Sequence, residues 1–228
     1  MKVQITYVET SKESTAQAEE SLQSFLSYGW SATLNKGITP STLNDNDFDV
    51  HDLPGGRLES FKQNESQKYP IKKSCLFNNL KFAESVIEAD QPMIFAEHDA
   101  LCIDSYTGWD FDEFCFLAMD YAFAPPTALS KPPYNSYRFP PSFGVVDFPS
   151  NYPLIYYKDS VYNGSMMTPG TAAYALSPKG AKKLLYAATS LGLEQSDFII
   201  NSYNLRLQYI TPSPVKYNSV NLNMSHTL

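Results

Sequence analysis

The chain has 228 residues, 43% of them hydrophobic, and a formal net charge of −7 at pH 7. This length and composition suit one sizeable domain with an ordinary apolar core, and we expect a single domain over residues 1–228. The negative net charge disfavours nonspecific electrostatic binding to nucleic acid or anionic lipid, although it does not exclude a local basic patch. Two groups of lysines could each meet a phosphate: Lys72 with Lys73, and Lys179 with Lys182 and Lys183. A solvated helix face is the commoner explanation of the second group.

Features that the sequence lacks indicate where the protein is located and whether it binds zinc. No apolar run approaches the roughly 20 residues that span a bilayer, and the first residues do not resemble a signal peptide, so we expect a cytoplasmic protein. The cysteines, Cys75, Cys102 and Cys115, form no CxxC pair, and the three histidines do not lie near them at ligand spacing. We therefore expect reduced thiols and no zinc site.

The N-terminal third predicts the start of an alternating β/α pattern. Residues 3–8 are rich in β-branched and aromatic side chains, as in a strand. Ser14 and Gln17 resemble a capping box at a helix start, and Gly29 lies where a helix ends. Apolar residues at helical spacing follow the cap: Ala18, Leu22, Phe25 and Leu26. A second short apolar run ends near Leu34, which completes a strand–helix–strand order.

The middle of the chain contains one strong helix and one buried strand. Residues 39–72 are polar and aperiodic, which predicts a long loop. An amphipathic helix follows, with an apolar stripe at Leu76, Phe77, Leu80, Ala83, Val86 and Ile87. Residues 92–96 then form an apolar run typical of a central strand. This run ends at Glu97, His98 and Asp99, the clearest local signal in the chain.

The composition shifts toward aromatics and proline over residues 111–162, where we expect packed loops around short strands at 114–119 and 154–157. Residues 120–165 form the aromatic and proline-rich region of the domain. Residues 171–176 predict a further strand. Ser177 and Pro178 then mark a helix start. A second helix is expected over 194–205, with Phe198, Ile199 and Tyr203 inward, followed by a last strand at 207–210. The whole pattern predicts an α/β domain with a mostly parallel central sheet flanked by helices.

The acids after the strand at 92–96 have the chemistry of a metal–phosphate site. Ligands of open α/β sheets bind beyond the carboxyl ends of the strands, and side chains at i and i+2 of an extended segment point the same way. Glu97 and Asp99 can therefore face one ligand, and their oxygens suit Mg²⁺ or Mn²⁺ bridging the phosphates of a nucleotide. Solvated or helix-capping acids are the alternative explanation of the same residues.

Three segments together resemble the lipopolysaccharide-type glycosyltransferases of family 25, which have the GT-A fold. These are the helix segment 74–80 with the strand and acids at 92–99, the glycine-led strand and helix at 170–185, and the acidic step at 195–198. Their order and spacing match over roughly residues 70–210. Two positions depart from the family pattern: His98 replaces the middle acid of the triplet, and Asn78 and Asn79 stand where Ser-His is usual.

The resemblance implies a metal-dependent, inverting transfer of a hexose from a nucleotide sugar, such as a UDP-sugar, to a carbohydrate or other hydroxyl acceptor. Asp99 would bind the metal ion, Mn²⁺ or Mg²⁺, and His226 near the C-terminus would assist it. Glu97 and His98 would lie at the donor, and Gly170 would let backbone approach it closely. Asp197 would be the general base, although a helix-capping Asp explains the same residue.

The remaining candidate contacts are placed by position alone. Four residues after the first strand lie where such enzymes bind the base and ribose: Val8, Glu9, Thr10 and Lys12. Aromatic side chains that could stack on sugar rings include Trp109, Tyr134, Tyr137 and Tyr162, although most aromatics must be core. We expect Asp104, Asp110 and Asp112 to be solvated loop residues.

Two alternatives stay open. The chain could glycosylate a modified base in DNA, an interpretation that the negative net charge disfavours without excluding nucleic acid. It could also be a non-catalytic carbohydrate- or nucleotide-binding module, which His98 in the acid triplet favours. A metal-dependent hydrolase is disfavoured because no dense His/Asp cluster is present, and no Gly-x-Ser-x-Gly elbow supports a serine hydrolase.

Overall fold

The structure is a computed structural model, and it describes residues 1–105, 108–118, 143–148, 161–162 and 172–218. In chain order its elements are β1 (Lys2–Tyr7), α1 (Lys12–Ser27), β2 (Ser31–Lys36), the 3₁₀ helix η1 (Asp45–Asp47), α2 (Arg57–Gln63), α3 (Lys68–Ala89), β3 (Met93–Glu97), β4 (Ala100–Cys102), β5 (Phe114–Phe116), β6 (Gly144–Asp147), β7 (Ala173–Leu176), α4 (Pro178–Tyr186), the π-helix η4 (Ala187–Leu191), α5 (Ser196–Ile199), β8 (Leu207–Thr211) and β9 (Val215–Tyr217).

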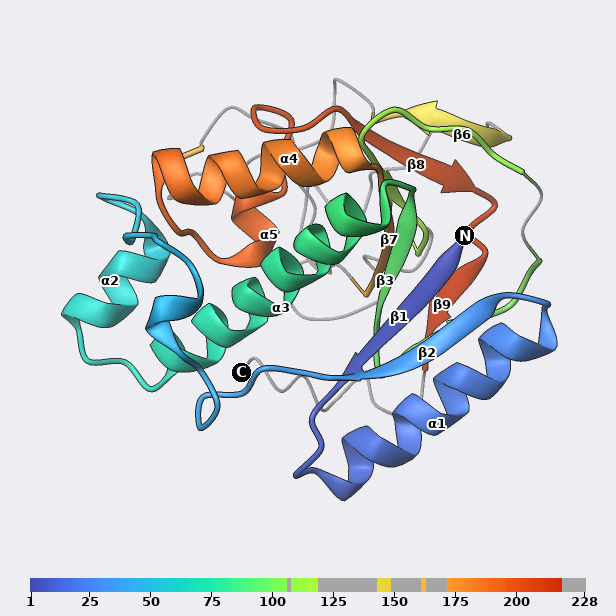
Figure 1. The fold of residues 1–228 in the computed structure, drawn as a ribbon, viewed down its shortest axis with the longest axis horizontal. Coiled ribbons are helices and arrows are strands. Elements are labelled where there is room, and N and C mark those ends of the chain that lie inside the picture. Colours follow the sequence, from blue (N-terminus) through green and yellow to red (C-terminus); the bar gives the residue numbers. More distant parts are fainter. Residues whose placement is uncertain (106–107, 119–142, 149–160, 163–171, 219–228) are drawn as a thin grey trace, which may run out of the picture.

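One seven-stranded sheet, in the order β2-β1-β3-β7-β5-β8-β6, forms the centre of the described structure (Figure 1). The pairs β1–β2, β1–β3 and β5–β8 are parallel, whereas β3–β7, β5–β7 and β6–β8 are antiparallel. The α/β class expected from the sequence is confirmed, with a sheet that is mixed. A separate two-stranded sheet pairs β4 with β9.

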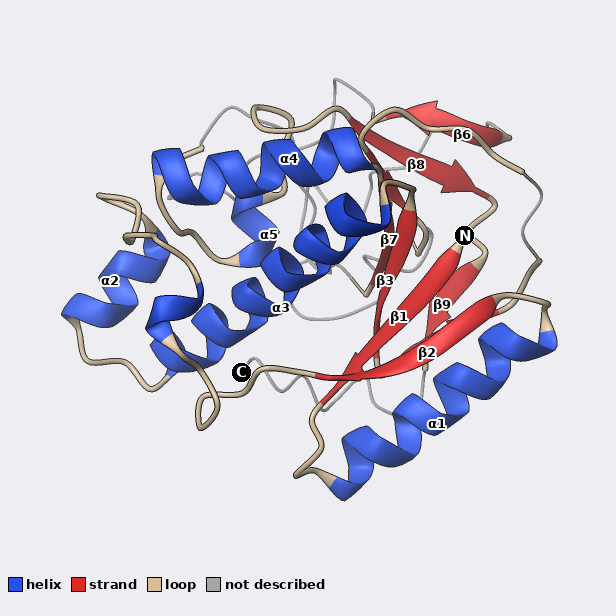
Figure 2. Ribbon diagram, viewed as in Figure 1, coloured by secondary structure: helices blue, strands red, loops and turns tan. Residues whose placement is uncertain are grey.

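Helices cover both faces of the large sheet (Figure 2). Alternate residues of β3 divide between two cores: Phe95 packs with α3 and α4, and Ile94 and Ala96 pack with α1. This is the alternation that a strand buried on both faces requires. The apolar stripe expected on α3 is buried, with Ile87 at its margin. Among the described residues, no helix combines the length and the apolar character needed to cross a bilayer.

Several element boundaries differ from the sequence prediction. The N-cap of α1 is Ser11 and not the expected Ser14, so the helix begins three residues earlier, at Lys12. The hydroxyl of Ser11 accepts a hydrogen bond from the Ser14 amide. Ser14 instead accepts a hydrogen bond from the Val8 amide, which ties the helix start to the end of β1. Leu26, expected inward, is 45% exposed.

The expected long loop at 39–72 is wrong, since it contains η1, α2 and the first turn of α3. The N-cap of α2 is Gly56, which has no side chain to cap with. The carboxylate of Glu194 accepts from the amides of Arg57 and Leu58 in its place. A cap supplied from 136 residues away leaves no local signature, and this explains the wrong prediction.

The expected helix at 194–205 is also wrong in length. It is reduced to α5, because the Asn201 side chain accepts from the amides of Tyr203 and Asn204 and so forms a turn. Phe198 and Ile199 are buried as expected, but Tyr203 is 73% exposed. The Ser177 cap and Pro178 start of α4 are confirmed. The strand expected at 207–210 is β8, and β9 follows it.

Candidate functional site

The carboxyl ends of the neighbouring strands β1 and β3 lie side by side at one end of the sheet, next to the N-terminal half of α3 (Figure 1). The strands are parallel, and Thr6 lies opposite Glu97. Glu97 follows Phe95 by two residues, and Phe95 packs its ring 5.5 Å from that of Phe82 on α3. Side chains at i and i+2 share a face, so Glu97 points to the α3 side of the sheet, as does Thr6.

Two aspartates act electrostatically on Glu97 at the carboxyl end of β3, and we call Glu97, Asp99 and Asp197 the acidic site. Glu97 ends β3, Asp99 lies in the turn that follows, and Asp197 comes from α5. Burial, together with the charges of Asp99 and Asp197, raises the pKa of Glu97 to about 8, and nearby Lys72 partly offsets this rise. Glu97 thus experiences the charges of both aspartates, while the roles expected for the three residues stay predictions.

One carboxylate oxygen of the acidic site lacks a partner among the described residues. It is Oδ1 of Asp99, which is buried. Within the described ranges, no Lys or Arg nitrogen lies within ion-pair distance of Glu97 or Asp99. A buried, unpaired acceptor costs free energy, so this edge of the sheet is arranged as a binding site would be.

Two asparagines of α3, Asn78 and Asn79, hold the elements around the acidic site together. Asn79 accepts from the Tyr174 hydroxyl at 2.6 Å and donates to the Ser196 hydroxyl at 3.4 Å, which joins α3 to β7 and to the residue before Asp197. Asn78 holds the backbone of Ile38 with two hydrogen bonds, of 2.7 and 2.9 Å. Both amides thus have structural roles beside the carboxylates.

Two residues that the sequence did not single out for the site also border it. Burial raises the pKa of the Cys75 thiol to about 11, with smaller contributions from Glu97 and Asp197, so the thiol stays neutral near pH 7. Burial also raises the pKa of Tyr217 far above its usual value, and the three carboxylates add to this. Tyr217 reaches the site because β9 pairs with β4 directly after the turn that carries Asp99. A long-range strand pair of this kind has no local sequence signal.

The residues expected to bind base and ribose follow β1 at the same edge. The Val8 amide bonds to Ser14, and Glu9 forms an ion pair of 2.6 Å with Lys36 at the end of β2. Thr10 is exposed, and Lys12 is the exposed first residue of α1. Their location agrees with the expectation, while their role stays a prediction.

Other sequence candidates lie elsewhere or outside the described residues. Gly170 and His226 fall outside them, as do Tyr134, Tyr137 and the strand expected at 154–157. Trp109 packs its ring 6.0 Å from that of Trp30, and Tyr162 is buried with its ring 6.2 Å from that of Tyr203. His98 lies half-buried in the turn between Glu97 and Asp99.

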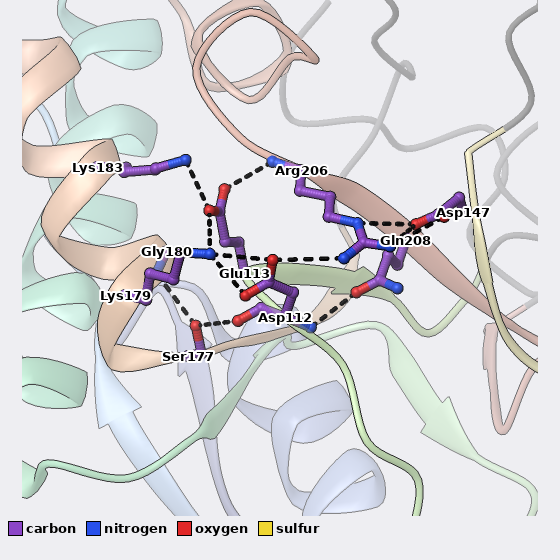
Figure 3. Close-up of polar contacts among 9 residues, drawn as sticks. All are labelled: Asp112, Glu113, Asp147, Ser177, Lys179, Gly180, Lys183, Arg206 and Gln208. Carbon is purple, nitrogen blue, oxygen red and sulfur yellow. Dashed lines mark hydrogen bonds and ion pairs between the residues drawn. The ribbon is translucent and has the colours of Figure 1, made fainter.

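A second group of acids lies at the opposite end of the sheet, and each of them is matched by a cation (Figure 3). We call this the paired cluster: Asp112, Glu113 and Asp147 with Lys179, Lys183 and Arg206. Asp112, expected as a solvated loop acid, lies 2.8 Å from Lys179, and Lys183 is 2.6 Å from Glu113. Lys179 and Lys183 are exposed on α4, as expected of a solvated helix face, and they also form these ion pairs.

A divalent ion at the acidic site needs ligands from outside the side chains described. In the parts of the chain that the structure describes, no three His, Cys, Asp or Glu side chains gather to hold a metal ion. The buried Asp99 oxygen suits a hard ion chemically. Mg²⁺ commonly keeps several waters and binds through one or two carboxylates plus substrate phosphates, and the residues present fit that mode.

Comparison with known proteins adds no family assignment: no protein-family model matches the chain, and no curated protein matches its sequence.

Proposed function

We propose that the chain is a nucleotide-sugar glycosyltransferase with a GT-A-like fold, which transfers a hexose from a UDP-sugar to a hydroxyl acceptor with inversion. The observation that carries this proposal is the convergence of Glu97, Asp99 and Asp197 at the carboxyl end of β3. Three matched segments in family order support it independently. The mixed sheet with helices on both faces is compatible with it.

The chain's own residues would divide the work by position. Asp99, with its buried and unpartnered oxygen, would hold Mn²⁺ or Mg²⁺ together with the donor phosphates. When bound, such an ion acts as a Lewis acid toward the departing diphosphate. Glu97 would orient the ribose or the ion. His226 and Gly170 keep the roles expected for them as proposals.

Asp197 would act as the general base. It is half-buried at the start of α5, and the preceding Ser196 is held by Asn79 of α3. This linkage fixes the backbone of Asp197 relative to the other two carboxylates. A carboxylate positioned in this way can take the proton of an acceptor hydroxyl as the hydroxyl oxygen attacks the anomeric carbon, and attack from the face opposite the leaving group inverts the configuration.

The direct test is a thermal-shift screen of UDP-, GDP-, CMP- and dTDP-sugars, each with and without Mn²⁺. A ligand at 100 times its dissociation constant stabilises the fold by about 2.7 kcal/mol, which is readily measured. The proposal predicts that one nucleotide sugar stabilises the chain in the presence of Mn²⁺ and is then turned over. It also predicts that Asp197→Asn retains the thermal shift but loses at least about 100-fold in turnover. Absence of any shift across the screen would contradict the proposal.

A non-catalytic nucleotide- or carbohydrate-binding module is the second candidate. It is favoured by the lack of a three-residue metal-ligand set among the described residues and by His98 in the turn between the acids. The same screen separates the two candidates. A module would show a nucleotide-dependent shift, no turnover of any donor, and no difference in turnover between the wild-type chain and Asp197→Asn.

A further inference from the structure

Two adjacent lysines at the start of α3 have different surroundings. Lys73 is committed to the fold: its side chain is 9% exposed, its ammonium is 2.8 Å from Asp45, and it lies over the rings of Tyr69 and Phe77. Lys72 is half-buried and has no hydrogen bond or ion pair with any residue in the described ranges. A half-buried ammonium with no anion among the described residues is unfavourable unless an anionic ligand accompanies it.

The helix geometry directs Lys72 toward the acidic site. Lys72, Cys75 and Asn79 are spaced by three and four residues, so they share one face of α3. The hydrogen bonds of Asn79 to Tyr174 and Ser196 turn that face toward β7 and α5. Lys72 lies two turns before Asn79, about 10 Å along the helix axis toward its N-terminus. Since α3 leads back into β3, this direction points beyond the carboxyl ends of the strands.

The electrostatics agree with this placement. The positive charge of Lys72 lowers the pKa of both Glu97 and Cys75, against the larger effect of burial, so its ammonium lies near both groups. Within the described ranges, Lys72 nevertheless forms no ion pair with Glu97 or Asp99. The ammonium is therefore close enough to share a ligand with the carboxylates without being neutralised by them.

A neighbouring hydroxyl indicates independently that a polar ligand enters here. Thr6 is 9% exposed, and its Oγ1 is buried without a hydrogen-bond partner among the described residues. It lies opposite Glu97 in the β1–β3 register, on the face that α3 covers. The side of the site next to α3 thus offers an unpaired cation and an unpaired hydroxyl, which together suit an anionic oxygen ligand such as a phosphate.

We propose that Lys72 binds the diphosphate of the nucleotide-sugar donor, so that the acidic site holds the donor between a cation on α3 and the carboxylates on β3. This inference rests on the proposed function and assigns a diphosphate contact to a residue of α3. The Lys73 side chain, held by Asp45, would take no part in it.

The role follows from the charge changes of the transfer. The bond between the anomeric carbon and the diphosphate oxygen breaks, and its electron pair stays with the diphosphate. The acceptor oxygen forms the new bond to the anomeric carbon, and its proton passes to Asp197. Negative charge therefore grows on the diphosphate oxygen as the bond lengthens, and a fixed ammonium at Lys72 stabilises that charge.

The test is isothermal titration calorimetry with UDP and with uridine, in Mn²⁺, on the wild-type chain and three variants. Lys72→Met is expected to weaken UDP binding by about tenfold or more and to leave uridine binding unchanged, because a charge-assisted hydrogen bond to phosphate is lost. Lys72→Arg keeps the charge and is expected to retain most of the affinity. Lys68→Met removes an exposed lysine one turn earlier on α3 and should match the wild-type chain.

The outcomes separate the inference from the function on which it rests. If Lys72→Met binds UDP as the wild-type chain does, the inference is overturned while the proposed function stands. If the wild-type chain binds neither UDP nor any other nucleoside diphosphate, the proposed function fails and the inference fails with it. A urea denaturation curve for each variant verifies folding, and Lys72→Gln repeats the test should Lys72→Met fail to fold.

Discussion

The two ends of the central sheet differ in how far their carboxylates form ion pairs with Lys or Arg. At the amino end of β3, the paired cluster matches Asp112, Glu113 and Asp147 with three cations. At the carboxyl end, Asp99 and Asp197 raise the pKa of Glu97, and nearby Lys72 has no ion pair with any residue that the structure describes. The fold therefore pairs the buried Glu113 and two more exposed acids with cations. At the other end, the buried Oδ1 of Asp99 has no partner among the described residues, as our proposal of a ligand site requires.

The pKa values of the half-buried Glu97 and the buried Glu113 show the same contrast. Burial would raise the pKa of Glu113, but hydrogen bonds from Lys183, the Arg206 amide and Lys179 outweigh it and hold this pKa below its usual value. Burial and like charges instead raise the pKa of Glu97 to about 8. The fold is therefore more stable when Glu113 is ionised, and more stable when Glu97 is protonated.

The largest expected effect comes from removing the charge of Glu113. Glu113→Gln loses the partner of Lys179, Lys183 and the Arg206 amide at a side chain that is 2% exposed. We expect the free energy of unfolding in urea to fall by about 2 kcal/mol near pH 7. Because the folded-state pKa lies below the usual value, the difference from wild type should shrink as the pH falls below about 4.

The matched control is Glu88→Gln, which removes the same charge from an exposed position on α3. It should leave the unfolding free energy within about 0.5 kcal/mol of wild type. Equal effects of the two substitutions would show that the paired cluster adds no stability, and the contrast between the two ends would lose its basis.

The second effect is a pH dependence of opposite sign at Glu97. Without a divalent ion, the folded chain binds the Glu97 proton more tightly than the unfolded chain, in which this glutamate keeps its ordinary pKa of 4.5. Stability should therefore fall as the pH rises from 4.5 to 8, with a slope of at most about 1.4 kcal/mol per pH unit from this group.

Glu97→Gln should remove that slope, so urea denaturation at a series of pH values compares it with wild type. The variant should gain stability over wild type as the pH rises toward 8. Parallel curves for the two chains would mean that Asp99, Asp197 and Lys72 do not perturb Glu97, and that the acidic site is no different from a solvated surface.

The smallest effect is expected at the exposed rim of the paired cluster. Arg206 donates from Nε and Nη2 to the two oxygens of Asp147, at 3.0 Å each, and so joins the segment before β8 to the edge strand β6. Arg206→Lys loses this two-point geometry. We expect a small decrease in melting temperature at low ionic strength that disappears in about 0.5 M salt, where the Debye length shortens to roughly 4 Å. A decrease that persists in high salt would assign Arg206 a packing role.

Local signals in the sequence predicted β3, which leads into the acidic site, and the start of α4, which lies beside the paired cluster. The apolar run at 92–96 predicted β3, and Ser177 with Pro178 predicted the start of α4, because strands buried on both faces and capped helices are marked by adjacent residues. The acids Glu97 and Asp99 could be placed at a strand end for the same reason.

Contacts between distant parts of the chain could not be predicted in this way. Helix α2 depends on a cap from Glu194, and Tyr217 reaches the acidic site through the pairing of β9 with β4. The paired cluster likewise joins residues from β6, α4 and the segment before β8. In each case the partner is fixed by tertiary packing, and neither residue type nor spacing reveals it.

The most direct test of the central claim is calorimetric titration of UDP in Mn²⁺ into the wild-type chain, Asp99→Asn and Asp90→Asn. Asp90 ends α3 in the left-handed region, with φ of 47°, where Asn is readily accommodated, so the control removes one exposed charge without strain. The account predicts that the wild-type chain and Asp90→Asn bind alike and that Asp99→Asn weakens binding by at least about tenfold. Equal binding by all three chains would contradict the assignment of the acidic site as the donor site.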